Sequence, residues 1–257
     1  MLTLNQIYKT YNKGSINESI LFSGFNLTVS EGQFISIVGS NGSGKSSLLN
    51  IICGSIDIDG GKILLRNKDI TGKREHKRSQ FIGRVFQDPA KGTCPNMSIL
   101  ENMSLADNKG KSYGLSAGIN KKRTDYYKSL LEQLKLGLED KINVMVGALS
   151  GGQRQALALL TSTMTPIDLL ILDEHTAALD PKTSENIMEL TDRIVKSKGI
   201  TTLMVTHNLR FAVNYGNRIL MMHNGEIVID ATDTEKQKIG INKLLEVFNE
   251  ISIECGN

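Results

Sequence analysis

Apolar residues form short continuous runs in several parts of the chain. The runs at residues 34–38, 169–172, 201–205 and 218–222 predict strands that are covered on both faces, because a half-exposed strand would alternate apolar with polar residues. Residues 184–199 instead carry apolar side chains at helical spacing and end in a glycine. This alternation of strand and helix predicts a parallel α/β sheet in the second half of the chain.

The N-terminal part shows a different pattern. Short strands are predicted at residues 2–4 and 34–38, and a turn separates them at 30–33. Residues 62–70 follow a second turn, at 59–61, and predict one arm of a hairpin. This part of the chain is therefore expected to consist mainly of strands.

Helical spacing dominates the middle of the chain, between about residues 98 and 164. Within residues 124–137, four apolar side chains fall on one helix face: Tyr127, Leu130, Leu131 and Leu134. Gly137 is placed to end that helix. Because this block interrupts the sheet, we interpret residues 90–163 as an inserted helical subdomain.

Helical spacing returns near the C-terminal end of the sequence. Residues 233–257 predict an amphipathic helix, and four apolar residues lie on one side of it: Leu244, Leu245, Phe248 and Ile251. We expect residues 1–235 to form the main domain and residues 236–257 to pack on it as a helix.

Composition narrows the class of protein. The 257 residues are 40% hydrophobic and 22% charged, which fits one large globular domain or a domain with an inserted piece and argues against disorder. A net charge of +3 and a pI of about 8.6 are too mild for a nucleic-acid partner or an anionic membrane surface. Cys53, Cys94 and Cys255 are widely spaced, which suggests a reducing compartment and no structural zinc.

The sequence suggests no route across a membrane. The first residues contain no apolar segment typical of a secretion signal, and no window approaches the roughly 18 uninterrupted apolar residues of a membrane-spanning helix. We therefore expect a cytoplasmic location. If the protein serves a membrane process, another chain must span the membrane.

Residues 39–46, GSNGSGKS, lie between a predicted strand and a predicted helix. Glycines let such a loop fold back, so that backbone N–H groups and the helix N-terminus point at an anion. Lys45 adds a positive charge for the β- and γ-phosphates of a nucleotide, and the Ser46 hydroxyl is suited to ligate Mg²⁺. The motif and its context together predict a nucleotide-phosphate site.

Two adjacent carboxylates, Asp173 and Glu174, follow the buried run 169–172. They could be solvated acids at the end of a strand. In combination with a phosphate loop, however, Asp173 is suited to hold the Mg²⁺ of a nucleotide through water. Glu174 points the other way and is suited to orient or deprotonate a water molecule aimed at the γ-phosphate.

A second helix start with exposed N–H groups is predicted at residues 149–153, LSGGQ. Ser150 and Gln153 have the spacing of a capping box, which places the helix start at the two intervening glycines. Exposed N–H groups at a helix start attract an anion. A capping box alone is common and usually only begins a helix.

Six motifs occur in an order that resembles the ABC ATPases. The loop at 39–46 resembles the Walker A motif, and Gln87 in VFQD resembles the Q-loop glutamine. LSGGQ is similar to the family signature, LLILDE to Walker B with its catalytic glutamate, and AALD to the D-loop. His207 in VTHN is similar to the switch histidine. The resemblance extends from about residue 2 to residue 235.

The resemblance implies a P-loop NTPase fold of the α/β class, with a RecA-like core, an N-terminal antiparallel β subdomain and an inserted helical signature subdomain. It implies ATP and Mg²⁺ as cofactors, with Glu174, His207 and Lys45 as catalytic residues and Ser46, Gln87 and Asp173 at the metal. The implied ATP-binding residues are Tyr11, Gly39, Ser40, Asn41, Gly42, Ser43, Gly44, Lys45, Ser46 and Ser47. The signature residues, which would act on the ATP of a second copy, are Leu149, Ser150, Gly151, Gly152 and Gln153.

Two residues need separate comment. Tyr11 resembles the aromatic residue that stacks on adenine, although Tyr8 is a nearby rival and a tyrosine is often a core residue. His175 departs from the family pattern, in which proline usually follows the catalytic glutamate. We expect His175 to pack against the segment 177–180 and to have no role in metal binding.

The resemblance implies the ATP-hydrolysing subunit of a membrane transporter. It would be a homodimer on the inner face of the cell membrane, docked on integral membrane permease subunits. Residues 92–106 resemble the region where importer-type ATPases receive a permease coupling helix. An importer subgroup that works with a lipoprotein receptor of the tryptophan or tyrosine type is resembled by four segments, 92–102, 151–164, 173–183 and 215–227. This resemblance implies a small solute such as an amino acid. The alternative is a soluble ABC ATPase that drives a non-transport machine, such as iron-sulfur assembly or DNA repair.

Overall fold

The computed structural model describes residues 1–111, 118–241 and 243–247. The chain divides into two compact units, of which unit 1 combines Met1–Ser79 with Gly199–Asn257 and unit 2 is Gln80–Lys198. The segment predicted as helical, 90–163, lies within unit 2.

Unit 1 contains two groups of paired strands. The first is antiparallel, in the order β2-β1-β4-β5. In the second, β3 runs parallel to both β8 and β9, and β10 runs antiparallel to β9. The elements of unit 1 are β1 (Leu2–Tyr11), β2 (Ser19–Val29), β3 (Phe34–Gly39), α1 (Lys45–Cys53), β4 (Gly60–Leu65), β5 (Lys68–Asp69), α2 (Glu75–Arg78), β8 (Thr201–Val205), α7 (Leu209–Asn214), β9 (Arg218–His223), β10 (Glu226–Thr232) and α8 (Asp233–Lys238).

The buried strands predicted from continuous apolar runs are confirmed. All six residues of β3 and all five of β8 are buried. The two strands pair in parallel, with Ile37 opposite Val205, so their carboxyl ends lie at the same edge of the sheet. This edge is where a ligand binds in an open α/β sheet.

The segment 62–70 corrects the sequence prediction. It was expected to be one arm of a hairpin, but β4 and β5 pair with each other, so the segment contains most of a complete hairpin. Arg66 and Asn67 between the two strands have φ values of 47° and 61°. Two consecutive residues with positive φ form the tight turn that joins antiparallel strands, and asparagine tolerates this conformation well.

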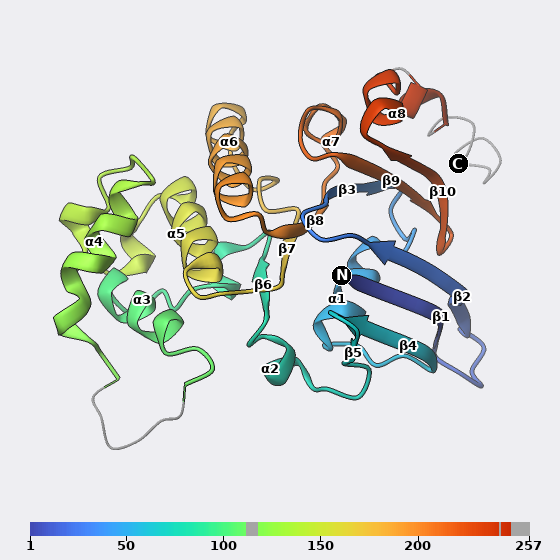
Figure 1. Ribbon diagram of the computed structural model, residues 1–257, viewed down its shortest axis with the longest axis horizontal. Coiled ribbons are helices and arrows are strands. Elements are labelled where there is room, and N and C mark those ends of the chain that lie inside the picture. Colours follow the sequence, from blue (N-terminus) through green and yellow to red (C-terminus); the bar gives the residue numbers. More distant parts are fainter. Residues whose placement is uncertain (112–117, 242, 248–257) are drawn as a thin grey trace. The chain divides into compact units, whose positions relative to one another are not determined.

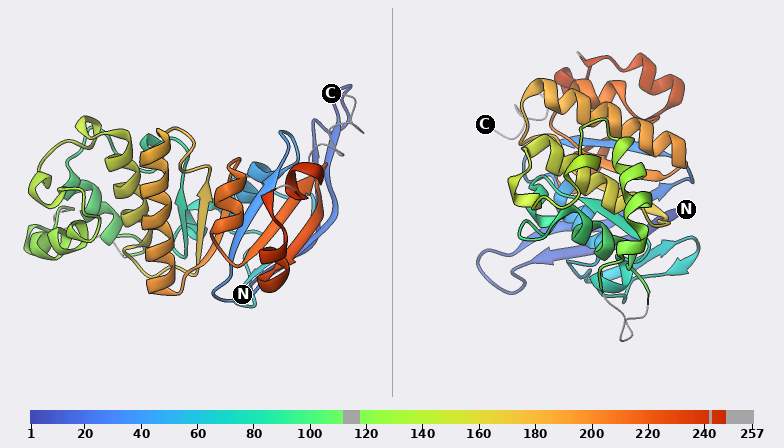
Figure 2. Two further views of the ribbon diagram at one scale, coloured as in Figure 1. Left: turned by 90° about the horizontal axis from the view of Figure 1, so that it is seen from above. Right: turned by 90° about the vertical axis from the view of Figure 1, so that its left-hand side faces the viewer.

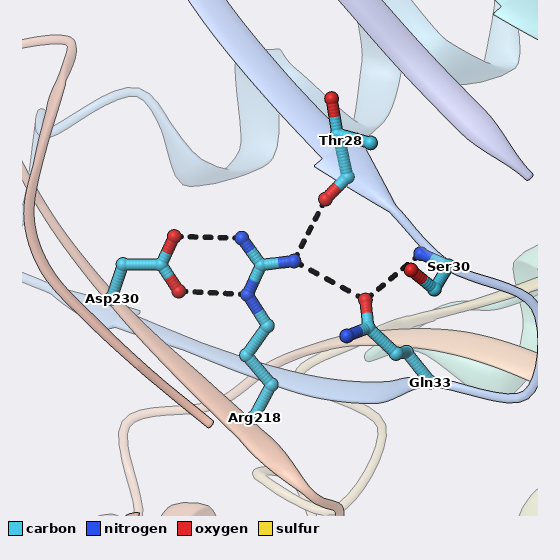
Figure 3. Close-up of polar contacts among 5 residues, drawn as sticks. All are labelled: Thr28, Ser30, Gln33, Arg218 and Asp230. Atoms are coloured by element: carbon cyan, nitrogen blue, oxygen red, sulfur yellow. Dashed lines mark hydrogen bonds and ion pairs between the residues drawn. The ribbon is translucent and has the colours of Figure 1, made fainter. Parts of the chain in front are cut away.

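Arg218 ties together the strand ends of unit 1 (Figure 3). Its Nε and Nη2 atoms donate to the two carboxylate oxygens of Asp230 at 2.7 Å each. Its Nη1 donates to the carbonyl of Thr28 and to Oε1 of Gln33, which also accepts from the backbone N–H of Ser30. Arg218 thereby connects β9 and β10 with the loop that leads into β3.

In unit 2, strands β6 and β7 run parallel, and helix α5 packs against β6. Helix α5 contacts α3, α4 and α6 as well as β6. Helices α3, α4 and α5 lie together (Figure 1), and α6 runs beside α5 (Figure 2). The elements of unit 2 are β6 (Ile82–Val85), α3 (Ile99–Asp107), α4 (Thr124–Glu132), α5 (Gly151–Thr163), β7 (Leu169–Asp173) and α6 (Pro181–Lys198), with short 3-10 turns at Pro89–Lys91, Lys121–Arg123, Glu139–Lys141 and Val146–Ala148.

Helix α4 has the predicted buried face but ends earlier than predicted. Of the four residues of this face, Tyr127, Leu131 and Leu134 are buried and Leu130 is half-buried. The helix stops at Glu132, before Gly137, because the next N–H groups bond three residues back and Lys135 turns the chain with a φ of 57°. The sequence pattern did not predict this end, because lysine rarely adopts a positive φ.

The predicted C-terminal helix is only partly within the described residues. Phe248 and Ile251 lie outside them. Leu244 is fully buried against the core of unit 1, together with Val38 and Met221, whereas Leu245 is 43% exposed. Within residues 1–111, 118–241 and 243–247, none of the helices has the length and apolar content to cross a bilayer.

Candidate active site

The loop after β3 encloses the side chain of Lys45. The Lys45 ammonium donates to the carbonyls of Gly39 and Ser40 at 2.8 Å each, and it lies 3.4 Å from Oγ of Ser43. The residue is only 5% exposed. The loop therefore wraps around a buried cation, as the sequence predicts for residues 39–46.

Gly39 is required for the tight approach of this loop to β9. Its φ is +153°, and an added Cβ would lie 2.2 Å from the carbonyl oxygen of Met222 and 2.8 Å from Oγ of Ser43. Gly225 lies in the turn between β9 and β10, and its N–H donates a hydrogen bond to the carbonyl of Ser43 in the loop. Neighbouring backbone thus fixes the loop on two sides.

Helix α1 presents its N-terminus to this loop. It begins at Lys45, and its N-cap is Gly44, which has no side chain to bond the first N–H groups. Its first turn also contains no acidic residue. These N–H groups and the positive end of the helix dipole consequently favour an anion at this position.

Tyr11 is hydrogen-bonded to Ser47, whereas Tyr8 is hydrogen-bonded to a residue of its own strand. The Tyr11 hydroxyl donates to Oγ of Ser47 at 3.2 Å, whereas the Tyr8 hydroxyl donates to Gln6. Tyr8 is also 44% exposed. Of the two candidate aromatic residues, the structure brings Tyr11 to the loop.

His207 comes from the same edge of the sheet as the loop. It follows β8, which pairs in parallel with β3, and is exposed. Asn208, the next residue, caps α7 by accepting from the N–H of Phe211 at 3.2 Å. The capped helix start gives the chain a defined path directly after His207.

In unit 2, the two acids emerge at the end of β7. Val85 is opposite Leu172 in the parallel pair β6 and β7, so Gln87, Asp173 and Glu174 follow the same edge. Asp173 accepts a hydrogen bond from Nη2 of Arg84 at 2.8 Å. Glu174 has a φ of 48°, a strained value for a residue with a side chain.

The predicted capping box at the signature is confirmed. Oγ of Ser150 accepts from the N–H of Gln153 at 3.2 Å, and Oε1 of Gln153 accepts from the N–H of Ser150 at 3.3 Å. Ser150 and Gly151 are exposed. Helix α5 therefore starts at exposed residues of unit 2.

The sequence analysis missed two polar residues that hold this region, Gln155 and Ser162. Nε2 of Gln155, a residue 1% exposed on α5, donates to the carbonyl of Phe86 at 3.0 Å. Oγ of Ser162 donates to the carbonyl of Arg84 at 2.9 Å. These bonds tie the signature helix to the strand that leads to Gln87. The only sequence signal was polar residues on the buried face of a helix.

His175 is buried and hydrogen-bonded to a residue of α6. It is 2% exposed, and its Nε2 lies 3.1 Å from Oγ1 of Thr191, whose hydroxyl donates to the carbonyl of Ile187. Nε2 is therefore assigned as the donor. Burial lowers the pKa of His175 to about 4, so the ring is neutral. The hydrogen bond to Thr191 anchors the ring to α6, and packing of His175 against residues 177–180 stays a prediction.

A comparison with known families identifies the protein's class. The family described as "ABC transporter" matches residues 22–177, more than half of the chain. The chain belongs to the ABC transporter family. This ABC subunit is 47% identical to the tyrosine transport ATP-binding protein of Clostridioides difficile, over 96% of this chain and 98% of the relative. It is 31% identical to a thiamine import ATP-binding protein of Photobacterium profundum, over 87% and 88%.

Solved structures agree with this assignment. A dimeric ATP-binding cassette in a post-hydrolysis state, bound to ADP and Pi, matches 90% of this ABC subunit and 98% of its own chain, at 31% identity and a TM-score of 0.75. A cassette in an ADP conformation matches 100% and 99%, at 27% identity and a TM-score of 0.79. The expected fold class is confirmed, and the ABC subunit is an ATPase.

Proposed function

We propose that this ABC subunit hydrolyses ATP to drive the uptake of a small solute, such as an amino acid, through a membrane permease. The observation that carries this proposal is the 47% identity with a tyrosine transport ATP-binding protein along almost the full length of both chains. The relative named for thiamine import supports the same direction of transport.

We infer that ATP binds at the loop after β3. The backbone N–H groups of residues 39–47 and the start of α1 bind the phosphates, and Lys45 neutralises charge on the β- and γ-phosphates. Tyr11 stacks on the adenine ring, which its hydrogen bond to Ser47 supports. The remaining phosphate-binding residues are Gly39, Ser40, Asn41, Gly42, Ser43, Gly44, Ser46 and Ser47.

The residues at the proposed metal site fit Mg²⁺. Ser46, Gln87 and Asp173 offer a hydroxyl, an amide oxygen and a carboxylate, and Mg²⁺ prefers such oxygen ligands. No group of three or more His, Cys, Asp or Glu side chains among the described residues could hold a metal ion, so nucleotide phosphates would complete the set. Asp173 would act through water. When bound, Mg²⁺ neutralises charge on the phosphate oxygens.

The chain's own residues then direct hydrolysis. Glu174 orients or deprotonates the attacking water, and its fixed backbone at the end of β7 limits the directions in which its carboxylate can point. His207 lies beside the γ-phosphate and holds the water or the leaving phosphate in line. Gln87 links the nucleotide to the helical part of unit 2, to which Gln155 ties the preceding residue.

A second copy of the chain completes each ATP site. Its signature, Leu149, Ser150, Gly151, Gly152 and Gln153, directs the N–H groups at the start of α5 to the γ-phosphate. The exposed, capped start of α5 and the dimeric cassette with ADP and Pi support this arrangement. The bound γ-phosphate stabilises the dimer, and its loss on hydrolysis loosens it.

The dimer docks on integral membrane permease subunits at the inner face of the membrane. In this proposal a substrate-binding lipoprotein of the tryptophan or tyrosine type delivers the solute, and the similarity to a tyrosine transport protein supports an amino acid as that solute. The alternative is a soluble ABC ATPase of the iron-sulfur-assembly or DNA-repair type, which would have only soluble partners.

Uptake of radiolabelled tyrosine and other amino acids by cells tests this proposal. Cells that express Glu174→Gln in place of the natural chain should lose at least nine-tenths of the uptake of one solute, because ATP is bound but not hydrolysed. Arg66→Gln, which removes an exposed ion pair with Glu31, serves as the control and should retain normal uptake. Unchanged uptake of every solute in the Glu174→Gln cells, with only soluble partners recovered from solubilised membranes, would contradict the transporter assignment.

A further inference from the structure

The ion pair between Arg84 and Asp173 has no place in the proposed chemistry. Arg84 lies in β6 and Asp173 ends β7, and the parallel pairing of these strands brings the two side chains together. Nη2 of Arg84 donates to Oδ2 of Asp173 at 2.8 Å. The guanidinium of Arg84 therefore bonds the carboxylate that we propose to hold Mg²⁺ through water.

The pair is held by one hydrogen bond. Nε of Arg84 is buried and has no hydrogen-bond partner among the described residues, and Arg84 bonds Oδ2 alone. Arg218 and Asp230 in unit 1 show the alternative, in which two N–H groups grip both carboxylate oxygens (Figure 3). Two parallel bonds are stronger and more specific than one. Arg84 can therefore release Asp173 more readily than Arg218 can release its own carboxylate.

The surroundings keep this cation close to Asp173. The guanidinium carbon of Arg84 lies 4.5 Å from the ring centre of Phe86. The side chains of Arg84 and Asp173 are 12% and 18% exposed, so solvent and salt screen their attraction less than at an open surface. Arg84 would repel a Mg²⁺ ion that approaches Asp173, because the two positive charges would lie close together.

We propose that Arg84 is a positioning residue that holds Asp173 between nucleotide cycles and must release it for Mg²⁺ to bind. Arg84 thereby sets how strongly nucleotide binding depends on Mg²⁺. In the nucleotide-free chain it offsets the repulsion between the adjacent carboxylates of Asp173 and Glu174. This inference rests on the proposed role of Asp173 at the metal.

The test compares the dissociation constant of ATP measured with EDTA and with Mg²⁺, by isothermal titration calorimetry in the Glu174→Gln background. The dissociation constant with EDTA divided by the dissociation constant with Mg²⁺ gives a ratio that reports how much Mg²⁺ strengthens ATP binding. Arg84→Gln removes the competing charge and should raise this ratio about threefold to tenfold. Arg66→Gln removes another arginine from an ion pair, distant in the sequence, and should leave the ratio unchanged.

Asp173→Asn separates the two proposals. It should lower the ratio towards one, and adding Arg84→Gln to it should cause no further change, because Arg84 acts through Asp173. If Asp173→Asn lowers the ratio but Arg84→Gln leaves it unchanged or lowers it, the inference about Arg84 is wrong and the metal assignment stands. If Asp173→Asn leaves the ratio unchanged, the metal assignment itself is wrong.

Folding of the variants is checked by cooperative thermal unfolding. Arg84→Met, which retains an apolar chain against Phe86, replaces Arg84→Gln if the latter does not fold, with the same expected ratio. If neither folds, Arg84→Lys provides the test, because a compact ammonium is more strongly hydrated and cannot present a guanidinium fork. Its ratio should rise about twofold, and an unchanged or lowered ratio would overturn the inference.

Discussion

At the scale of single residues, the phosphate loop depends on backbone that approaches too closely for any side chain. Gly39 leaves no room for a Cβ, because the carbonyl oxygen of Met222 and the hydroxyl of Ser43 lie 2.2 Å and 2.8 Å from its position. The same loop surrounds Lys45, so a shift of Gly39 displaces the carbonyls that orient the ammonium. Gly39 thus sets the geometry of the loop, although it has no side chain with which to contact the nucleotide.

Gly39→Ala tests this dependence. The added methyl group would lie 2.2 Å from backbone, which cannot move as a side chain could, so the loop must shift. We expect a loss of ATP affinity of at least tenfold, measured by isothermal titration calorimetry, because the N–H groups lose their common direction.

Gly32→Ala is the matched control for this substitution. Gly32 also has a positive φ, of +73°, but an added Cβ meets nothing within 4 Å. It should cost about 1 kcal/mol of stability through backbone strain alone and leave ATP affinity unchanged. Equal affinities for the Gly39→Ala variant and the natural chain would contradict the account of the loop.

At the scale of elements, helix α8 is fixed to unit 1 by a buried lysine. Nζ of Lys236 donates to the carbonyls of Tyr215 and Gly216, which follow α7. Lys236 is 4% exposed, and burial lowers its pKa to about 8. The folded chain therefore disfavours the proton that an unfolded chain would hold up to about pH 10.5.

The stability of the chain should consequently rise with pH above 8. Between pH 8 and 10.5 the unfolded state binds a proton at Lys236 that the folded state has lost, so raising the pH favours folding, by at most about 1.4 kcal/mol per pH unit. The measurement is urea unfolding at pH 7 to 10 for the natural chain and for Lys236→Met. The free energy of unfolding of the natural chain should rise relative to the variant above pH 8.

Lys238→Met, which removes an exposed lysine from the same helix, serves as the control for this comparison. A difference between the natural chain and Lys236→Met that is constant, or that falls, across this pH range would show that Lys236 is not held as described.

The elements also show what the sequence could and could not predict. Strands β3, β7, β8 and β9 were readable because burial on both faces leaves a continuous apolar run. The early end of α4 was not, because Lys135 adopts an unusual conformation that no local pattern marks. The motifs of the candidate site are local and were therefore visible. The bonds that position them join residues far apart: Arg84 to Asp173 and Gln155 to Phe86.

At the scale of the whole molecule, the proposed site residues divide between the two units. The phosphate loop, Tyr11 and His207 belong to unit 1, whereas Gln87, the two acids and the signature belong to unit 2. The signature lies at the exposed, capped start of α5, and a related cassette is dimeric with ADP and Pi. The central claim is that ATP joins two copies of the chain, each contributing the signature to the nucleotide of the other.

The molar mass of the Glu174→Gln variant, measured by light scattering after gel filtration with ATP and Mg²⁺, tests this claim most directly. We predict twice the 28.2 kDa of one chain with ATP and a single chain's mass without it. The double variant with Lys45→Ala should remain at the mass of one chain, because it loses the charge that binds the phosphates. If the Glu174→Gln variant keeps the mass of one chain at saturating ATP, and also fails to pair with a second copy when the permease is added, the claim is wrong.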